Sequence, residues 1–131
     1  GDSPLLLWRS GKLRRLNEDH SMRGFYMEYV RNGLMEPREA MLQGHVLRTA
    51  VTGEPLDMVD LPEKPSILLP GDRVVLATDG VEHLLMAPLL PLAAKKALAA
   101  PHLSAAAAIV SACVDLQDPT ADNTTVIVLD A

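Results

Sequence analysis

A short apolar run that stops at an acidic turn is the feature of this sequence that most limits its fold. Residues 74–77 are Val-Val-Leu-Ala, which predicts a strand buried on both faces. The turn sequence Pro70-Gly71-Asp72 precedes the run, and Thr78-Asp79-Gly80 follows it directly. Such a carboxylate is well placed to hold a hard cation, because strand packing fixes its position and glycine lets a ligand approach the backbone. A turn that begins a helix, with Asp79 as its cap, also explains these residues.

Length, charge and cysteine usage limit the classes of function that this chain can have. A chain of 131 residues is expected to form one domain. The net charge of −5 and the lack of a Lys/Arg run argue against a nucleic-acid partner. Cys113 is the only cysteine, which suits a reducing compartment, and its apolar helical context predicts a buried, inert thiol. No apolar run approaches the roughly 18 residues of a membrane span and no signal peptide opens the chain, so we expect a soluble, cytoplasmic protein without a membrane partner.

The first residues predict an interior strand. Residues 5–8 are apolar on both faces, and Ser10-Gly11-Lys12 predicts a hairpin turn into a second, half-exposed strand. A chain rarely begins with an interior strand. We therefore expect this chain to be the later part of a larger domain, and residues 5–8 to lack neighbours on one flank.

The remaining elements alternate between helices and strands. Residues 19–44 predict a small helical insertion, whose first helix stops near Asn32-Gly33 and whose second begins at Pro37. Extended structure is expected from Val46 onward. The later predictions are a strand at 66–69 paired with 73–77, helices at 81–86, 91–100 and 104–116, and a final strand at 124–129.

Three aspartates lie next to predicted strands. Asp2 precedes the first strand, Asp79 follows the strand at 74–77, and Asp122 precedes the final strand. Neighbouring strands can bring such ends together, and three close carboxylates would repel one another unless a divalent ion neutralised them. Oxygen ligands without His or Cys favour Mg²⁺ or Mn²⁺ over Zn²⁺. Aspartate is also common in turns, so an unrelated α/β module would account for the same acids.

Five motifs occur in order along the chain. They are Gly1-Asp2-Ser3, Asn17-Glu18-Asp19-His20-Ser21, Val46-Leu47-Arg48-Thr49-Ala50, Leu69-Pro70-Gly71-Asp72 with Ala77-Thr78-Asp79-Gly80, and Ala121-Asp122-Asn123-Thr124-Thr125-Val126. Over essentially its whole length the chain resembles the later portion of metal-dependent serine/threonine protein phosphatases of type 2C, particularly those of bacteria.

This resemblance implies an α+β fold, an αββα sandwich of two antiparallel sheets flanked by helices, of which residues 1–131 form only the C-terminal portion. It implies that Asp79 and Asp122 bind the first catalytic metal, Mg²⁺ or Mn²⁺, with Gly80 and Asn123 supporting the site. Asp2, together with Asp79, would hold a third metal, and residues 19–44 would form a flap beside the active site. In this family a metal-activated water hydrolyses phosphoserine or phosphothreonine in proteins, as in bacterial signalling opposite a kinase.

The chain also departs from the family. The earlier Asp-Gly motif, whose Asp bridges both catalytic metals, has no counterpart here, nor does the phosphate-binding Arg or a general acid, and Thr78 stands where Ser is usual. We therefore name no catalytic residue besides the metal ligands and expect this chain alone to be inactive. The expected partners are a phosphoprotein substrate and the missing N-terminal half of the domain, in the same or a separate chain. The alternative is a catalytically incomplete, phosphatase-like regulatory or partner-binding module.

Overall fold

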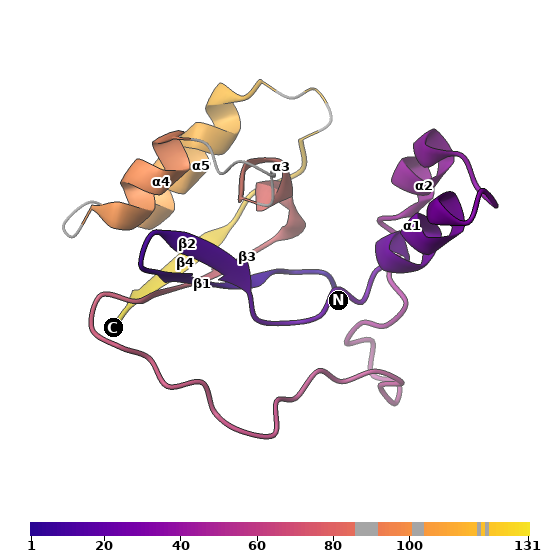
Figure 1. Cartoon of the computed structure of the whole chain (residues 1–131), viewed down its shortest axis with the longest axis horizontal. Coiled ribbons are helices and arrows are strands. Elements are labelled where there is room, and N and C mark those ends of the chain that lie inside the picture. Colours follow the sequence, from indigo (N-terminus) through magenta and orange to yellow (C-terminus); the bar gives the residue numbers. More distant parts are fainter. Residues whose placement is uncertain (86–91, 101–103, 118, 120) are drawn as a thin grey trace. The chain divides into compact units, whose positions relative to one another are not determined.

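The computed structural model describes residues 1–85, 92–100, 104–117, 119 and 121–131 (Figure 1). The chain forms two compact units. The first unit comprises residues 1–2 and 18–63, and the second comprises residues 3–17 and 64–131. Among the described helices, none combines the length and apolar character needed to cross a membrane.

The second unit is built on a four-stranded antiparallel sheet, with the order β2-β1-β3-β4. Its strands are β1 (Leu5–Arg9), β2 (Lys12–Arg15), β3 (Arg73–Ala77) and β4 (Val126–Asp130). Ser10 and Gly11 connect β1 to β2 with φ angles of 50° and 78°, the left-handed conformation that a two-residue hairpin needs. The predicted hairpin and the strand after the Pro-Gly-Asp turn are thus confirmed, as is the α+β class.

Two predictions about the sheet are wrong. Strand β1 does not lack a neighbour, because β3 pairs with it on the side opposite β2, placing Leu6 beside Val75. Residues 66–69 form no strand. They lead into a tight turn in which the Asp72 N–H donates to the Leu69 carbonyl (3.0 Å) and Gly71 takes a φ of 87°. The second neighbour of β3 is β4, from the far end of the chain.

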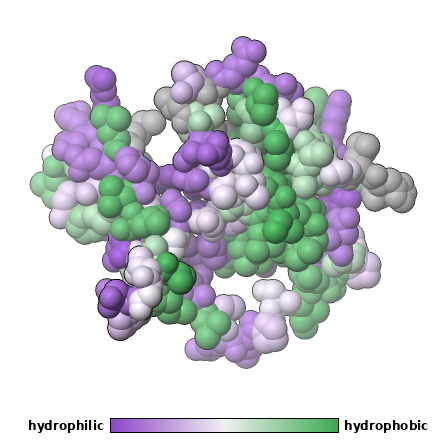
Figure 2. Space-filling model, turned by 180° about the vertical axis from the view of Figure 1, so that it is seen from behind, coloured by the Kyte–Doolittle hydropathy of each residue, from purple (hydrophilic) through white to green (hydrophobic). Residues whose placement is uncertain are grey.

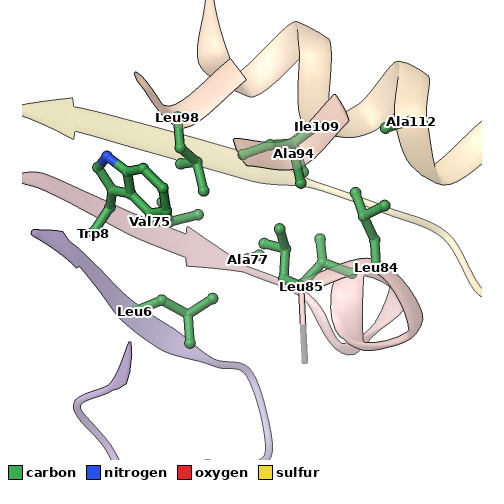
Figure 3. Close-up of a cluster of buried hydrophobic side chains, with 11 residues drawn as sticks. Leu6, Trp8, Val75, Ala77, Leu84, Leu85, Ala94, Leu98, Ile109 and Ala112 are labelled. Atoms are coloured by element: carbon green, nitrogen blue, oxygen red, sulfur yellow. The ribbon is translucent and has the colours of Figure 1, made fainter. Parts of the chain in front are cut away.

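Helices cover one face of this sheet. Leu92–Ala99 (α4) and Ala105–Asp115 (α5) pack beside each other, and with the short elements Asp79–Val81 (η1) and Glu82–Leu85 (α3) they close a hydrophobic core (Figure 3). The buried core side chains are Leu6, Trp8, Val75, Ala77, Val81, Leu84, Leu85, Ala94, Leu98, Ile109 and Ala112. Ser104 caps α5 by accepting a hydrogen bond from the Ala107 N–H (3.3 Å). The predicted helix ends at Met86 and Pro91 lie outside the described residues.

A buried arginine ties the sheet to the end of α4. The guanidinium of Arg73 donates to the backbone carbonyls of Ala97 (2.9 Å), Leu98 (3.0 Å) and Ala100 (2.7 Å). Its Nε also lies 2.7 Å from a carboxylate oxygen of Asp130. The last carbonyls of a helix lack partners within the helix and carry partial negative charge, so this cation satisfies and stabilises the end of α4.

The other face of the sheet remains apolar and partly exposed. By strand alternation its side chains are Leu5, Leu7, Val74, Leu76, Ile127 and Leu129, which the strand register aligns across β1, β3 and β4. Leu76 is 40% exposed, and Ile127 and Leu129 are each 55% exposed. Hydrophobic residues are also conspicuous on the face of the molecule in Figure 2. Leu7 of this row is only 1% exposed, so we give the name open sheet face to the exposed members alone, Leu76, Ile127 and Leu129.

The first unit contains two helices packed against each other, α1 (Arg23–Arg31) and α2 (Pro37–Gln43). Gly33, with a φ of 68°, follows α1, and Pro37 occupies the first turn of α2, as the sequence predicts. The extended structure expected from Val46 is limited to one bridge, between Ser21 and Leu47. The assignment of residues 19–44 as a flap stays a prediction.

The turn before β3 is held by an ion pair that should respond to acid. Arg9 binds Asp72 through two hydrogen bonds, from Nε to Oδ1 (2.8 Å) and from Nη2 to Oδ2 (2.5 Å), and the Leu69 N–H donates to Oδ2 (2.7 Å). The hydrogen bonds from Arg9, with a smaller contribution from Leu69, lower the pKa of Asp72 from 3.8 to about 2. Asp72 is therefore a structural residue of its motif.

The lowered pKa predicts how stability depends on pH. Because the folded protein binds the Asp72 proton less tightly than the unfolded chain does, this carboxylate stabilises the fold above pH 3.8, and that stabilisation is lost as the pH falls to about 2. We expect Asp72→Asn to be less stable at pH 7 and to lose less stability in this window. Urea denaturation of wild type and variant at several values between pH 2 and pH 7 measures the stability at pH 7 and its loss in acid. The control is Asp115→Asn, which changes an exposed carboxylate. An unchanged acid response in Asp72→Asn would contradict the assignment.

Candidate functional site

The end of β3 is joined to the segment that precedes β4. The Thr78 N–H donates to the Thr125 carbonyl (3.1 Å), the Thr78 hydroxyl donates to the Asn123 carbonyl (3.0 Å), and the Thr125 N–H donates back to that hydroxyl (3.0 Å). Thr78 immediately precedes Asp79, and Asn123 immediately follows Asp122. These hydrogen bonds therefore bring together the two segments that carry the predicted ligands of the first metal.

Gly80 allows this close approach. It is buried, and a Cβ atom built on it would lie 2.7 Å from the Asn123 carbonyl oxygen, 2.9 Å from the Asp122 carbonyl oxygen and 2.6 Å from the Thr124 hydroxyl. The sequence interpretation gave this glycine a different reason, that it lets a ligand approach the backbone. In the structure the chain's own backbone occupies that space, so packing against the Asp122 segment requires glycine.

The two carboxylates differ in their surroundings. Asp79 is half-buried at the first position of η1, after Thr78 as the N-cap residue, so the alternative in which Asp79 caps a helix is wrong. Among the described residues, the Asp79 carboxylate has no hydrogen-bond or ion-pair partner. Asp122 is exposed, and its Oδ1 accepts the Asn123 N–H (2.6 Å). Both side chains thus retain oxygen atoms that can bind a cation.

These donors fit the expected ions as part of a ligand set. Carboxylate oxygens suit Mg²⁺ and Mn²⁺. In the part of the chain that the structure describes, no three His, Cys, Asp or Glu side chains form a group that could hold a metal. Further ligands are therefore needed. Asp2 belongs to the first unit and Asp79 to the second, so the predicted third-metal pair stays a prediction.

Thr78 has a larger part here than the sequence suggests, whereas Cys113 does not. Thr78 is a departure from the family pattern, yet its hydroxyl both donates and accepts across the two segments. Burial raises the pKa of the half-buried Cys113 thiol of α5, and the nearby Thr124 side chain only partly offsets this rise. A raised pKa keeps a thiol protonated and unreactive, in line with the expected inert cysteine.

Comparison with known proteins relates this geometry to solved structures. No protein-family model matches the sequence, and no curated protein matches it. The PPM Ser-Thr phosphatase MsPP from Mycobacterium smegmatis is 30% identical over 99% of this chain and 53% of its own, with a TM-score of 0.57. The Mycobacterium tuberculosis serine/threonine phosphatase PstP/Ppp is 28% identical over 99% of this chain and 52% of its own, with a TM-score of 0.60.

A more distant structure shares the fold. The S. agalactiae serine/threonine phosphatase is 19% identical over 100% of this chain and 52% of its own, with a TM-score of 0.68. This chain thus spans about half the length of each phosphatase that it matches. Over nearly its whole length the chain is therefore similar to solved PPM serine/threonine phosphatases, and its extent is consistent with a C-terminal portion of their length.

Proposed function

We propose that this chain supplies part of the active site of a metal-dependent phosphatase that hydrolyses phosphoserine and phosphothreonine in proteins. The observation that carries the proposal is the junction of the Asp79 and Asp122 segments through Thr78 and Gly80. Similarity to serine/threonine phosphatases over nearly the whole chain supports the reaction class.

The proposed metal ligands are the three aspartates of the sequence prediction. Asp79 and Asp122 would bind one Mg²⁺ or Mn²⁺ ion, and Asp2 with Asp79 would bind another. The catalytic domain of PstP, 28% identical to this chain, has been solved in complex with two manganese ions. When bound, such ions lower the pKa of a water nucleophile and stabilise the charge that develops on the phosphoryl oxygens.

The residues of this chain would contribute by positioning these carboxylates. A metal ligand must be held at a fixed place before the ion binds, because mobile ligands lose conformational freedom on binding. The Thr78 hydroxyl bridges the two ligand-bearing segments, and the close contact at Gly80 leaves little room for them to shift. Asn123 contributes its backbone carbonyl to the same junction.

The open sheet face supports the need for the rest of the domain. Leu76, Ile127 and Leu129 expose apolar surface on a sheet whose opposite face is already covered by helices. The solved phosphatases are about twice as long as this chain. We propose that the N-terminal half of the domain, in the same or a separate chain, contributes a second sheet that packs on this face and completes the metal ligands.

Activity of the full-length protein tests the function. We expect hydrolysis of p-nitrophenyl phosphate that requires added Mn²⁺ or Mg²⁺ and stops on chelation with EDTA, because Asp79 and Asp122 would then be left without their ion. Phosphothreonine and phosphoserine peptides should be hydrolysed as well. Full-length protein that folds and binds Mn²⁺ but hydrolyses none of these substrates would favour the alternative, a phosphatase-like regulatory or partner-binding module.

A further inference from the structure

A largely buried ion pair joins β2 to the short helix α3. Nη1 of Arg15 lies 3.6 Å from Oε1 of Glu82, and the two side chains are only 15% and 11% exposed. Oε1 of Glu82 is itself shielded from solvent. Arg15 lies on the helix-covered face of the sheet, because Leu13, two positions earlier in β2, packs against the hydrophobic core. Charges shielded from water in this way interact more strongly than charges at the surface.

The acid of this pair is connected directly to the turn that carries Asp79. Glu82 follows η1, which begins at Asp79, and the Glu82 N–H donates to the Asp79 carbonyl. The Val81 N–H donates to the Thr78 carbonyl (3.3 Å) in the same turn. So short a helix has too few hydrogen bonds of its own to be rigid. The position of η1 therefore depends on what holds its two ends.

The base of this pair is held in place by the hairpin from which it projects. Nε of Arg15 donates to Oδ1 of Asn17 (3.3 Å), and the same oxygen accepts the Leu5 N–H (2.8 Å). Nδ2 of Asn17 donates to the Ser3 carbonyl (3.0 Å). Asn17 thus links the guanidinium to the backbone at the start of β1. An arginine side chain normally has many rotamers, so this bond restricts the direction from which Arg15 meets Glu82.

We propose that Arg15 is a positioning residue for the metal ligand Asp79 and acts through Glu82. The inference rests on the proposed function, because it takes Asp79 as a ligand. The hydrogen bonds of Thr78 hold the start of η1, and the Arg15–Glu82 pair holds its end. The Asp79 carboxylate has no partner among the described residues, so the backbone of η1 determines where its oxygens can lie.

Amide hydrogen exchange of the full-length protein without added metal tests the positioning. Arg15→Met keeps the length of the side chain and removes its charge. The N–H groups of Thr78, Val81 and Glu82 all donate hydrogen bonds in the structure. They should exchange about tenfold faster relative to those at the centre of β3, because loss of the cation lets η1 open locally. Arg14→Met, the same substitution at the exposed neighbouring residue, should leave these rates unchanged.

Mn²⁺ titration by calorimetry measures the consequence for the metal. Arg15→Met should weaken Mn²⁺ binding by about tenfold, as expected for a residue that orients a ligand without touching the ion. Arg15→Lys keeps the positive charge and should retain most of the affinity. Glu82→Gln keeps the size of the acid and should have the same effect as Arg15→Met. If Arg15→Met does not fold, Glu82→Gln provides both measurements.

Two patterns of exchange, and one of binding, would overturn the inference. Equal acceleration in η1 and at the centre of β3 would show that the ion pair stabilises the fold as a whole and has no particular effect on Asp79. Wild-type exchange rates in η1 of both Arg15→Met and Glu82→Gln would show that the pair does not hold this turn. Wild-type affinity for Mn²⁺ in both variants would show that holding the turn does not position the ligand.

The two measurements separate this inference from the proposed function. If the wild-type protein binds no Mn²⁺ and hydrolyses no p-nitrophenyl phosphate, the proposed function and the metal role of Arg15 are both wrong, although faster exchange in Arg15→Met would still show that the pair holds η1. If the wild-type protein binds Mn²⁺ and hydrolyses the substrate, but Arg15→Met changes neither exchange nor affinity, the proposed function stands and the positioning role is wrong.

Discussion

Full-length protein carrying Asp79→Asn is expected to lose phosphatase activity, with kcat/KM for p-nitrophenyl phosphate reduced by at least about 100-fold. Changes to groups that only orient metal ligands typically cost 10- to 100-fold, so loss of a ligand should cost at least as much. The amide keeps the size of the carboxylate but removes its negative charge. Because Asp79 has no partner among the described residues, the substitution should leave the folded structure intact.

Two comparisons make this prediction specific. Asp122→Asn should reduce activity to a similar extent, since the two aspartates are proposed to bind the same ion. Asp115→Asn changes an exposed acid at the end of α5 and should leave kcat/KM unchanged. Mn²⁺ titration by calorimetry should show weaker binding in the first two variants only. If Asp79→Asn kept the wild-type rate and the wild-type affinity for Mn²⁺, Asp79 would not be a metal ligand.

Gly80→Ala is expected to destabilise the protein by about 1–3 kcal/mol, the usual cost of inserting a methyl group into a packed site. The added Cβ would lie within 3 Å of two backbone carbonyl oxygens, those of Asp122 and Asn123, and backbone cannot rotate aside as a flexible side chain can. The Asp122 segment must therefore move away from β3, so activity should fall together with stability.

The matched control is Gly24→Ala in α1. A Cβ at Gly24 meets no atom within 4 Å, and alanine favours a helix over glycine by roughly 0.5–1 kcal/mol, so this variant should be as stable as wild type or more so. Urea denaturation compares the two variants, and the Mn²⁺-dependent rate reports on the site. If Gly80→Ala were as stable and as active as wild type, the close contact at Gly80 would not constrain the site.

Local sequence signals predicted many elements correctly. The two-residue turn at Ser10 and Gly11, the strand after Pro70-Gly71-Asp72, and the Pro37 start of α2 all depend on the conformations that neighbouring residues allow. Each can be inferred from a few consecutive residues. The apolar run at residues 66–69 was wrongly predicted to form a strand, because hydrophobicity alone does not show whether a neighbouring strand is available for pairing.

The reasons for the site residues were harder to infer. Sequence context suggested Asp79, Gly80 and Asp122, but it explained Gly80 by ligand access and gave Thr78 only as a departure from the family, where Ser is usual. Both residues contact a segment more than forty positions away in the chain. No local pattern reports such a contact, since it depends on which strands pair.

The sequence by itself determined the hairpin, the helical segments and the order of acidic motifs, because backbone preferences and residue order act over short distances. Only the tertiary structure decided that β3 lies between β1 and β4, that Arg73 binds the end of α4, and that the Asp122 segment packs against Gly80. These arrangements follow from the packing of residues distant in the chain, whose joint burial and hydrogen bonding select one pairing among many that the local signals permit.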